Sequence, residues 1–161
     1  MEKKYNFITL IWMAILALCL SGCASTTAVE ETTTVEPKEG KVIGTYTEKS
    51  YDIKIDYNIR STKNALIMAG TVENLLLKDI SFFELDISLS REKKGKVIAL
   101  KKLSSPGLDS DDSMSFIFSF PRLNGPIHWK FNYEYTSYDD FFKRDVYESG
   151  WFDRNMIVPS P

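Results

Sequence analysis

The chain has 161 residues, of which 43% are hydrophobic and 26% charged, and its formal net charge is −2 at neutral pH. The length predicts one domain, and the abundance of Phe, Tyr and Trp excludes a fully disordered chain. Because the small negative charge offers no basic footprint for DNA or RNA, we expect no nucleic-acid partner.

Residues 1–22 have the layout of a secretory signal peptide. Lys3 and Lys4 precede an apolar run from Phe7 to Leu20. As a helix, these 14 residues would rise about 21 Å, which is short of the roughly 30 Å hydrocarbon core of a membrane. We therefore expect a cleaved signal peptide, and we keep a permanent membrane-spanning helix as the weaker alternative.

The only two cysteines of the chain, Cys19 and Cys23, lie at the end of this run. A disulfide between them would form inside a segment expected to be removed, and a metal site would need further ligands nearby. Cys23 as an ordinary small residue near a cleavage site is another alternative. The string Leu20-Ser21-Gly22-Cys23 resembles the lipobox of bacterial lipoproteins.

This resemblance implies that the signal peptide is cut before Cys23 and that diacylglycerol is joined to the Cys23 thiol, often with an acyl group on the new amino terminus. No other cofactor is expected. Since two or three acyl chains hold a protein stably on a bilayer, the membrane is the first expected partner. With Ala24 next, the resemblance implies the outer membrane, mostly on its periplasmic side, in a Gram-negative cell. In a Gram-positive cell it implies the outer face of the plasma membrane.

Residues 23–40 are rich in Ser, Thr and Glu and contain no aromatic residue. Such a segment cannot bury enough surface to offset its ordering entropy, so we expect a flexible linker. The folded body is then expected over residues 41–161.

The body alternates apolar and polar residues with the period of two that is typical of half-buried strands. The alternation runs through residues 51–60, 83–90, 113–120 and 127–136. Two more apolar segments cover 65–72 and 96–103, and a short last strand is expected at 146–151. About seven antiparallel strands predict an all-β, immunoglobulin-like sandwich, with a small antiparallel barrel as the alternative.

Three short motifs in the middle of the body resemble those of secreted bacterial sandwich domains of the FxLYD type. They are a Gly-x-Val-x-Asn string, a Gly turn between two strands, and a Pro-Gly pair that leads to a Phe. Here they are Gly70-Thr71-Val72-Glu73-Asn74, Gly95, and Ser105-Pro106-Gly107 before Phe116. The resemblance spans roughly residues 64–120 and implies an envelope protein without known catalysis.

Few residues of the body suggest catalysis. The single histidine, His128, falls on the polar side of its strand, so we expect it on the surface rather than as a general base. Glu84, Asp86 and Glu134 could pair as glycosidase carboxylates, although strand alternation places most carboxylates on polar faces in any case. We expect no enzyme activity, and no small-molecule substrate is identified.

The carboxylates of Asp109, Asp111 and Asp112 could bind Ca²⁺ weakly, but the spacing lacks the Gly and distal Glu of the helix-loop-helix calcium motif. A solvated turn is the simpler interpretation.

Two sets of aromatic residues could also form binding surfaces. The stripe Trp129, Phe131, Tyr133 and Tyr135 could be a carbohydrate platform, but its strict alternation predicts core. Tyr138, Phe141 and Phe142 fall in a turn region, where a loop that folds back on the sandwich end is the simpler interpretation and a partner surface is the alternative.

Together these features predict a lipid-anchored protein of the cell envelope whose sandwich is a non-catalytic binding or scaffolding module, with an envelope protein as a possible partner. The alternatives are an ion-binding or enzymatic envelope protein that uses the acidic turn, and a structural accessory subunit of an envelope complex.

Overall fold

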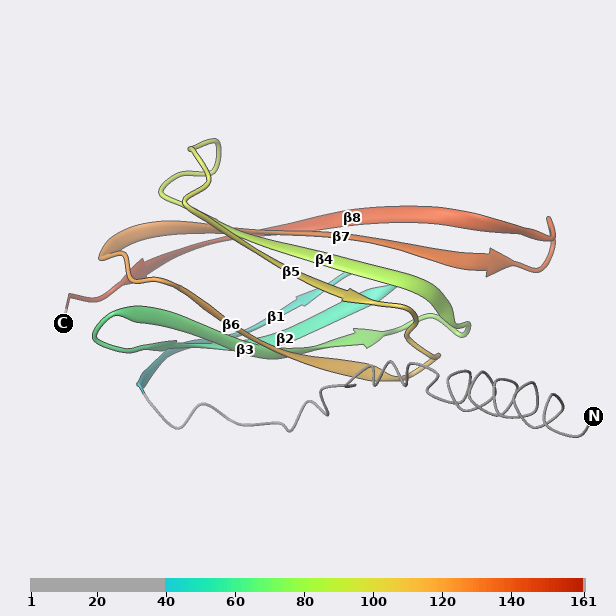
Figure 1. Cartoon of the computed structure of the whole chain (residues 1–161), viewed down its shortest axis with the longest axis horizontal. Coiled ribbons are helices and arrows are strands. Elements are labelled where there is room, and N and C mark those ends of the chain that lie inside the picture. The colour runs from blue at the N-terminus through green and yellow to red at the C-terminus, as the bar shows by residue number, and fades with distance from the viewer. Residues whose placement is uncertain (1–39, 161) are drawn as a thin grey trace, which may run out of the picture. The chain divides into compact units, whose positions relative to one another are not determined.

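The computed structural model describes residues 40–160, which form eight β-strands and no α-helix (Figure 1). The strands are β1 (Lys41–Lys49), β2 (Ile53–Ser61), β3 (Ala65–Asn74), β4 (Ile80–Ser90), β5 (Ala99–Ser105), β6 (Ser113–Pro121), β7 (Gly125–Asp139) and β8 (Arg144–Val158). This part of the chain offers no helix with the length and hydropathy to cross a membrane.

The strands pair antiparallel in two four-stranded sheets, in the orders β1-β2-β3-β6 and β5-β4-β7-β8. Figure 1 shows the two sheets as two layers, with β7 and β8 on the upper side. The orders β2-β3-β6 and β5-β4-β7-β8 are those of strands A-B-E and C′-C-F-G in an immunoglobulin-like sandwich. The all-β sandwich prediction is therefore confirmed, and the barrel alternative is wrong because the two sheets are separate.

Strand β1 is an eighth strand that the sequence did not predict. Gly44 interrupts its apolar residues, and the register with β2 shifts between Val42 and Gly44. A β-bulge of this kind breaks the alternation on which strand prediction depends.

Some predicted strand limits also change. β8 is 15 residues long instead of a short strand at 146–151, and β5 begins at Ala99 rather than at residue 96. β2 begins at Ile53, which leaves Tyr51 in the preceding turn with 75% of its surface exposed.

The core lies between the sheets and is formed by the inward half of each alternating strand. Its largest fully buried side chains include Trp129, Tyr135, Phe83, Phe120 and Phe131. The predicted aromatic core stripe is confirmed, since none of its four members is more than 6% exposed. Ring centroids of Phe120 and Trp129, from different sheets, lie 4.8 Å apart in an edge-to-face arrangement. This contact joins the two sheets through the core.

The edge strands β1 and β8, which belong to different sheets, are joined by an ion pair. Arg154 Nε lies 2.5 Å from Glu48 Oε1, and the guanidinium lies 4.5 Å from the ring centroid of Tyr46. The hydrogen bond to Glu48 raises the pKa of Arg154 above its usual value. The pair links the two sheets at these edges.

The alternation over residues 51–60 predicts Asp52 on the polar face, but the structure buries it. Only 3% of it is exposed, and its Oδ1 accepts hydrogen bonds from the Tyr133 hydroxyl and the Ile53 backbone N–H, each at 3.1 Å. The carboxylate satisfies groups of the β1–β2 turn, so it is buried with partners rather than hydrated.

Candidate functional site

The outer face of the β5-β4-β7-β8 sheet gathers polar and aromatic side chains from three neighbouring strands. Antiparallel register places Glu84 of β4 beside Glu134 of β7, which in turn lies beside Ser149 of β8. The next row on this face contains Asp86, Asn132 and Trp151 in the same way. Because side chains two apart on a strand share a face, these two rows form one continuous surface.

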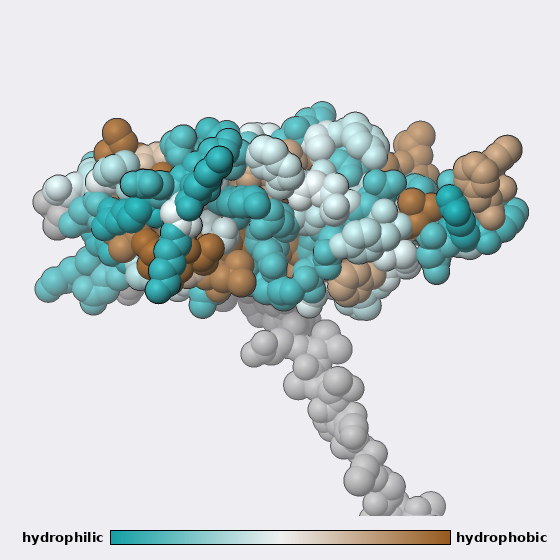
Figure 2. Space-filling model, turned by 90° about the horizontal axis from the view of Figure 1, so that it is seen from above, coloured by the Kyte–Doolittle hydropathy of each residue, from teal (hydrophilic) through white to brown (hydrophobic). Residues whose placement is uncertain are grey.

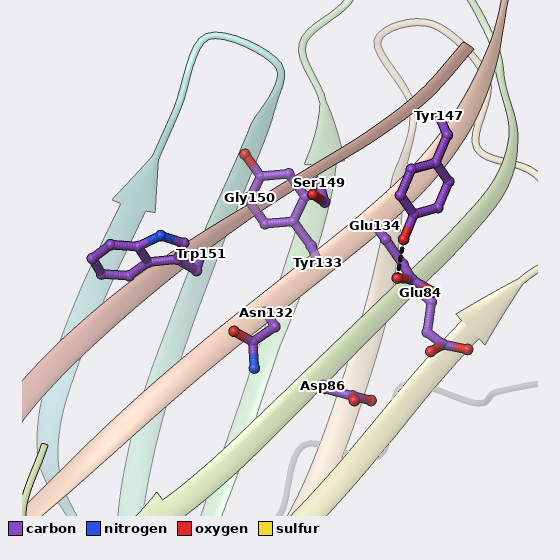
Figure 3. Close-up of a pocket in the computed structure, with 9 residues that line it drawn as sticks. All are labelled: Glu84, Asp86, Asn132, Tyr133, Glu134, Tyr147, Ser149, Gly150 and Trp151. Atoms are coloured by element: carbon purple, nitrogen blue, oxygen red, sulfur yellow. Dashed lines mark hydrogen bonds between the residues drawn. The ribbon is translucent and has the colours of Figure 1, made fainter. Parts of the chain in front are cut away.

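These rows enclose a hollow of about 280 Å³, which we call the acidic hollow (Figure 3). Its lining residues are Glu84, Asp86, Asn132, Tyr133, Glu134, Tyr147, Ser149, Gly150 and Trp151. Three of them carry carboxylates and none carries a positive charge. The structure thus brings together the three carboxylates that the sequence analysis weighed as a glycosidase set.

Each carboxylate of the acidic hollow lies near a hydroxyl or an ammonium group. The Tyr147 hydroxyl donates a hydrogen bond to Glu134 Oε2, the dashed line in Figure 3, and this bond raises the pKa of Tyr147. The Lys102 ammonium donates to Glu84, which raises the pKa of Lys102. Asp86 Oδ1 is buried without a hydrogen bond, 3.6 Å from Lys102 Nζ.

Two aromatic side chains flank these polar groups. Trp151 and Tyr147 are 59% and 60% exposed, and Figure 3 shows them on either side of Asn132 and Glu134. An exposed ring presents an apolar face of fixed shape, and the groups between the rings are hydrogen-bond acceptors and donors. This arrangement can bind a small ligand that has both an apolar face and several hydroxyl groups.

The sequence analysis missed Trp151 and Tyr147 as site residues. Their signal was present in the alternation of Tyr147, Ser149, Trp151 and Asp153 along the last strand. The predicted strand at 146–151 contained both residues, but alternation does not tell which outward side chains become neighbours across strands.

Trp151 also borders a second hollow, of about 220 Å³, which we call the basic hollow. Its lining residues are Lys93, Lys94, His128, Lys130, Trp151 and Asp153. Lys93 Nζ lies 3.0 Å from Asp153 Oδ2 and 5.7 Å from the ring centroid of Trp151. Trp151 thus lines both hollows, of which one is lined by three carboxylates and the other by three lysines and one carboxylate.

The prediction that His128 lies exposed on the surface is wrong, because only 2% of it is exposed. Alternation did place it on the outer side of β7, beside Ser90 of β4 and Asn155 of β8. The segment between β4 and β5 then brings Lys93 and Lys94 to the same place. The path of a loop, which alternation does not encode, decides the burial.

The turn that contains Asp109, Asp111 and Asp112 is held by hydrogen bonds to its backbone carbonyl groups. The Asn74 side-chain amide, fully buried, lies 3.0 Å from the Leu108 carbonyl oxygen and 3.1 Å from that of Asp109. Across residues 40–160, no three His, Cys, Asp or Glu side chains are grouped as a metal site would need. Asp109, Asp111 and Asp112 thus do not form a three-ligand cluster.

Tyr138, Phe141 and Phe142 lie at the tip of the β7–β8 hairpin, which extends to the right end of Figure 1. They are 46%, 86% and 61% exposed, so the two phenylalanines do not fold back into the sandwich. In Figure 2 hydrophobic colours gather towards the two ends of the view, whereas its middle is mostly hydrophilic or neutral. That the tip contacts a partner stays a prediction.

The lipobox residues Leu20, Ser21, Gly22 and Cys23 and the linker to residue 39 lie outside the described residues. The predictions for the signal peptide and the lipid anchor therefore stay predictions.

No protein-family model matches the sequence, and no curated protein matches it either.

Proposed function

We propose that the chain is a lipid-anchored protein of the cell envelope whose sandwich binds saccharides, without catalysis, on the outer face of the β5-β4-β7-β8 sheet. The observation that carries the binding role is the pair of exposed rings, Trp151 and Tyr147, on either side of a row of carboxylate and amide groups. The sequence from Lys3 to Cys23, with its lipobox, supports the anchor.

A saccharide fits this chemistry better than an apolar ligand. The C–H face of a sugar ring can pack on an indole ring, and its hydroxyls can donate to carboxylates and to the Asn132 amide oxygen. The acidic hollow, about 280 Å³, is slightly smaller than the roughly 300–1,000 Å³ typical of pockets for drug-sized ligands. It therefore suits a single small unit of a longer chain.

Binding without turnover is supported by the state of the carboxylates. Glu84 accepts a hydrogen bond from Lys102, and Glu134 accepts one from Tyr147. A glycosidase needs a carboxylic acid and a carboxylate that flank the bond to be cut. Here both glutamates lie on one side of any ligand that rests on the sheet.

The binding role can be tested by calorimetric titration of residues 40–161 with xylo-, cello- and chito-oligosaccharides. We expect at least one series to bind, and Trp151→Ala to weaken that binding at least tenfold. Tyr51→Ala removes an aromatic side chain that is 75% exposed in a turn away from the two hollows, so it is the matched control. Absence of binding in all three series, or equal losses in both variants, would refute the proposal.

The anchor can be tested by expressing the full chain with Cys23→Ala. We expect the unmodified protein to partition into detergent and to carry lipid mass on its amino terminus, and the variant to lose both. Unchanged detergent partitioning in the variant would contradict a lipid anchor and favour an uncleaved apolar helix.

A second candidate function, glycoside hydrolysis, follows from one observation, that Glu84, Asp86 and Glu134 line the same hollow. The oligosaccharide that binds should be incubated with the protein and assayed for new reducing ends. Release of reducing ends that Glu134→Gln abolishes while binding remains would replace the non-catalytic role by this one.

A further inference from the structure

The basic hollow contains a buried histidine nitrogen without a partner. His128 is 2% exposed, and its Nδ1 lies 2.8 Å from Asn155 Oδ1. Its Nε2 makes no hydrogen bond, since the nearest carboxylate oxygen, Asp153 Oδ1, is 4.0 Å away. A buried polar atom left unpaired is costly, so this nitrogen calls for a partner such as a water molecule or an ion.

The charges around this nitrogen favour an anion. Three lysines, Lys93, Lys94 and Lys130, line the hollow against one carboxylate, that of Asp153. Asp153 is already paired with Lys93. Among residues 40–160, Lys94 and Lys130 have no carboxylate within ion-pair distance, so two cations remain uncompensated beside the imidazole.

We propose that the basic hollow binds the anionic substituent of an acidic saccharide whose adjoining sugar ring lies on Trp151. The anion site is inferred from His128 and the lysines alone, whereas the position of the sugar ring rests on the proposed function. Carboxylate, sulfate and phosphate share the required chemistry, because each offers several oxygen acceptors to ammonium and imidazole donors.

His128 donates to the anion from Nε2. Its Nδ1 meanwhile stays beside the Asn155 side-chain amide, 2.8 Å from Oδ1. Lys93, Lys94, Lys130 and Asp153 are the charged groups that line the hollow with it.

The two hollows together predict a charge pattern in the ligand. On the far side of Trp151, the carboxylates of the acidic hollow repel a second anion. A saccharide with an acidic group on one ring and neutral rings beyond it therefore fits, whereas a saccharide with an acidic group on every ring is disfavoured.

Three oligosaccharides separate these cases: neutral xylotriose, xylotriose that carries one glucuronic acid, and tetragalacturonate with a charge on each ring. We expect the singly charged probe to bind at least tenfold more tightly than either of the others. Lys94→Ala with Lys130→Ala should remove that advantage and leave xylotriose binding unchanged. Lys143→Ala, which removes an exposed lysine at the hairpin tip, is the matched control.

Because His128 is the only histidine in the chain, its ring nitrogens give an unambiguous NMR signal. Inorganic phosphate and the singly charged probe should each shift the Nε2 signal, because the anion gives this buried nitrogen a hydrogen-bond partner. No change in the ring signals at saturating phosphate would overturn the anion site without any need for a His128 variant.

The outcomes distinguish the two proposals. If phosphate alters the His128 ring but no oligosaccharide binds, the anion site stands and the saccharide function fails. If xylotriose binds through Trp151 and the added charge changes nothing, the function stands and the present inference is overturned. Tighter binding to phosphatidylglycerol vesicles than to the singly charged probe would also overturn it, in favour of a lipid headgroup.

Discussion

Trp129 and Trp151 belong to the same β-hairpin and lie on opposite faces of one sheet. Trp129 is fully buried, and its ring centroid lies 4.8 Å from that of Phe120. Its indole nitrogen lies 3.1 Å from Met156 Sδ. Trp151 is 59% exposed, with Lys93 Nζ 5.7 Å from its ring centroid. The same residue type thus stabilises the fold on one face and is available to a ligand on the other.

The largest expected effect is on the inner face. Trp129→Ala should lower the free energy of unfolding by about 3–5 kcal/mol, because it removes a large core side chain and leaves a cavity. Trp151→Ala, on the outer face, should change it by no more than about 0.5 kcal/mol. Urea unfolding followed by circular dichroism measures both. Similar losses in the two variants would show that the faces are not energetically distinct.

Gly150 and Ser149 provide a smaller version of the same test. Gly150 faces inward, and a Cβ at this position would collide with the ring of Tyr133. Gly150→Ala should therefore cost about 1–3 kcal/mol through overpacking, whereas Ser149→Ala on the outer face should cost no more than about 0.5 kcal/mol. A thermal melt of each variant measures the difference, and a neutral Gly150→Ala would show that Tyr133 can move aside.

The Tyr133 hydroxyl tests how far the inner face depends on a polar contact. It donates to Asp52 Oδ1 at 3.1 Å and lies 3.1 Å from Ser50 Oγ. Tyr133→Phe should lower the free energy of unfolding by about 0.5–1.5 kcal/mol, since one hydrogen bond is lost while the Ile53 N–H still donates to Asp52 Oδ1. Tyr147→Phe, which removes an exposed hydroxyl on the outer face, is the control and should have little effect on denaturant unfolding.

The smallest expected effect lies at the hairpin tip, outside both faces. The backbone N–H groups of Phe142 and Phe141 donate to Asp139 Oδ1 at 3.0 and 2.9 Å, and these bonds lower the pKa of Asp139. The carboxylate should therefore stabilise the turn above its ordinary pKa of about 3.9, and this contribution should vanish as the pH falls through the lowered value.

Amide hydrogen exchange at Phe141 and Phe142, compared at pH 6 and pH 3, measures this effect. Asp139→Asn should reduce the difference in protection between the two pH values. Asp140→Asn, whose side chain is 89% exposed, should not alter it. A pH dependence that survives in Asp139→Asn would assign it to another group.

The candidate site was predictable only in its parts. Alternation alone placed Glu84, Asp86 and Glu134 on polar faces, and the structure confirms that they face outward together. It could not tell that they meet in one hollow, because their meeting depends on the register between β4 and β7. The roles of Trp151 and Tyr147 were missed for the same reason, since only the register between β7 and β8 brings them to this hollow.

The sequence by itself determined the strands with clear alternation, the inward face of each and the all-β class, because side-chain direction along a strand is a local property with a period of two. It also contained the string Leu20-Ser21-Gly22-Cys23, a local pattern whose resemblance to a lipobox needs no fold. Only the tertiary structure decided which outward residues become neighbours, how β1 joins the edge, and why His128 is buried. These features depend on strand register and loop path, which bring together residues far apart in the chain.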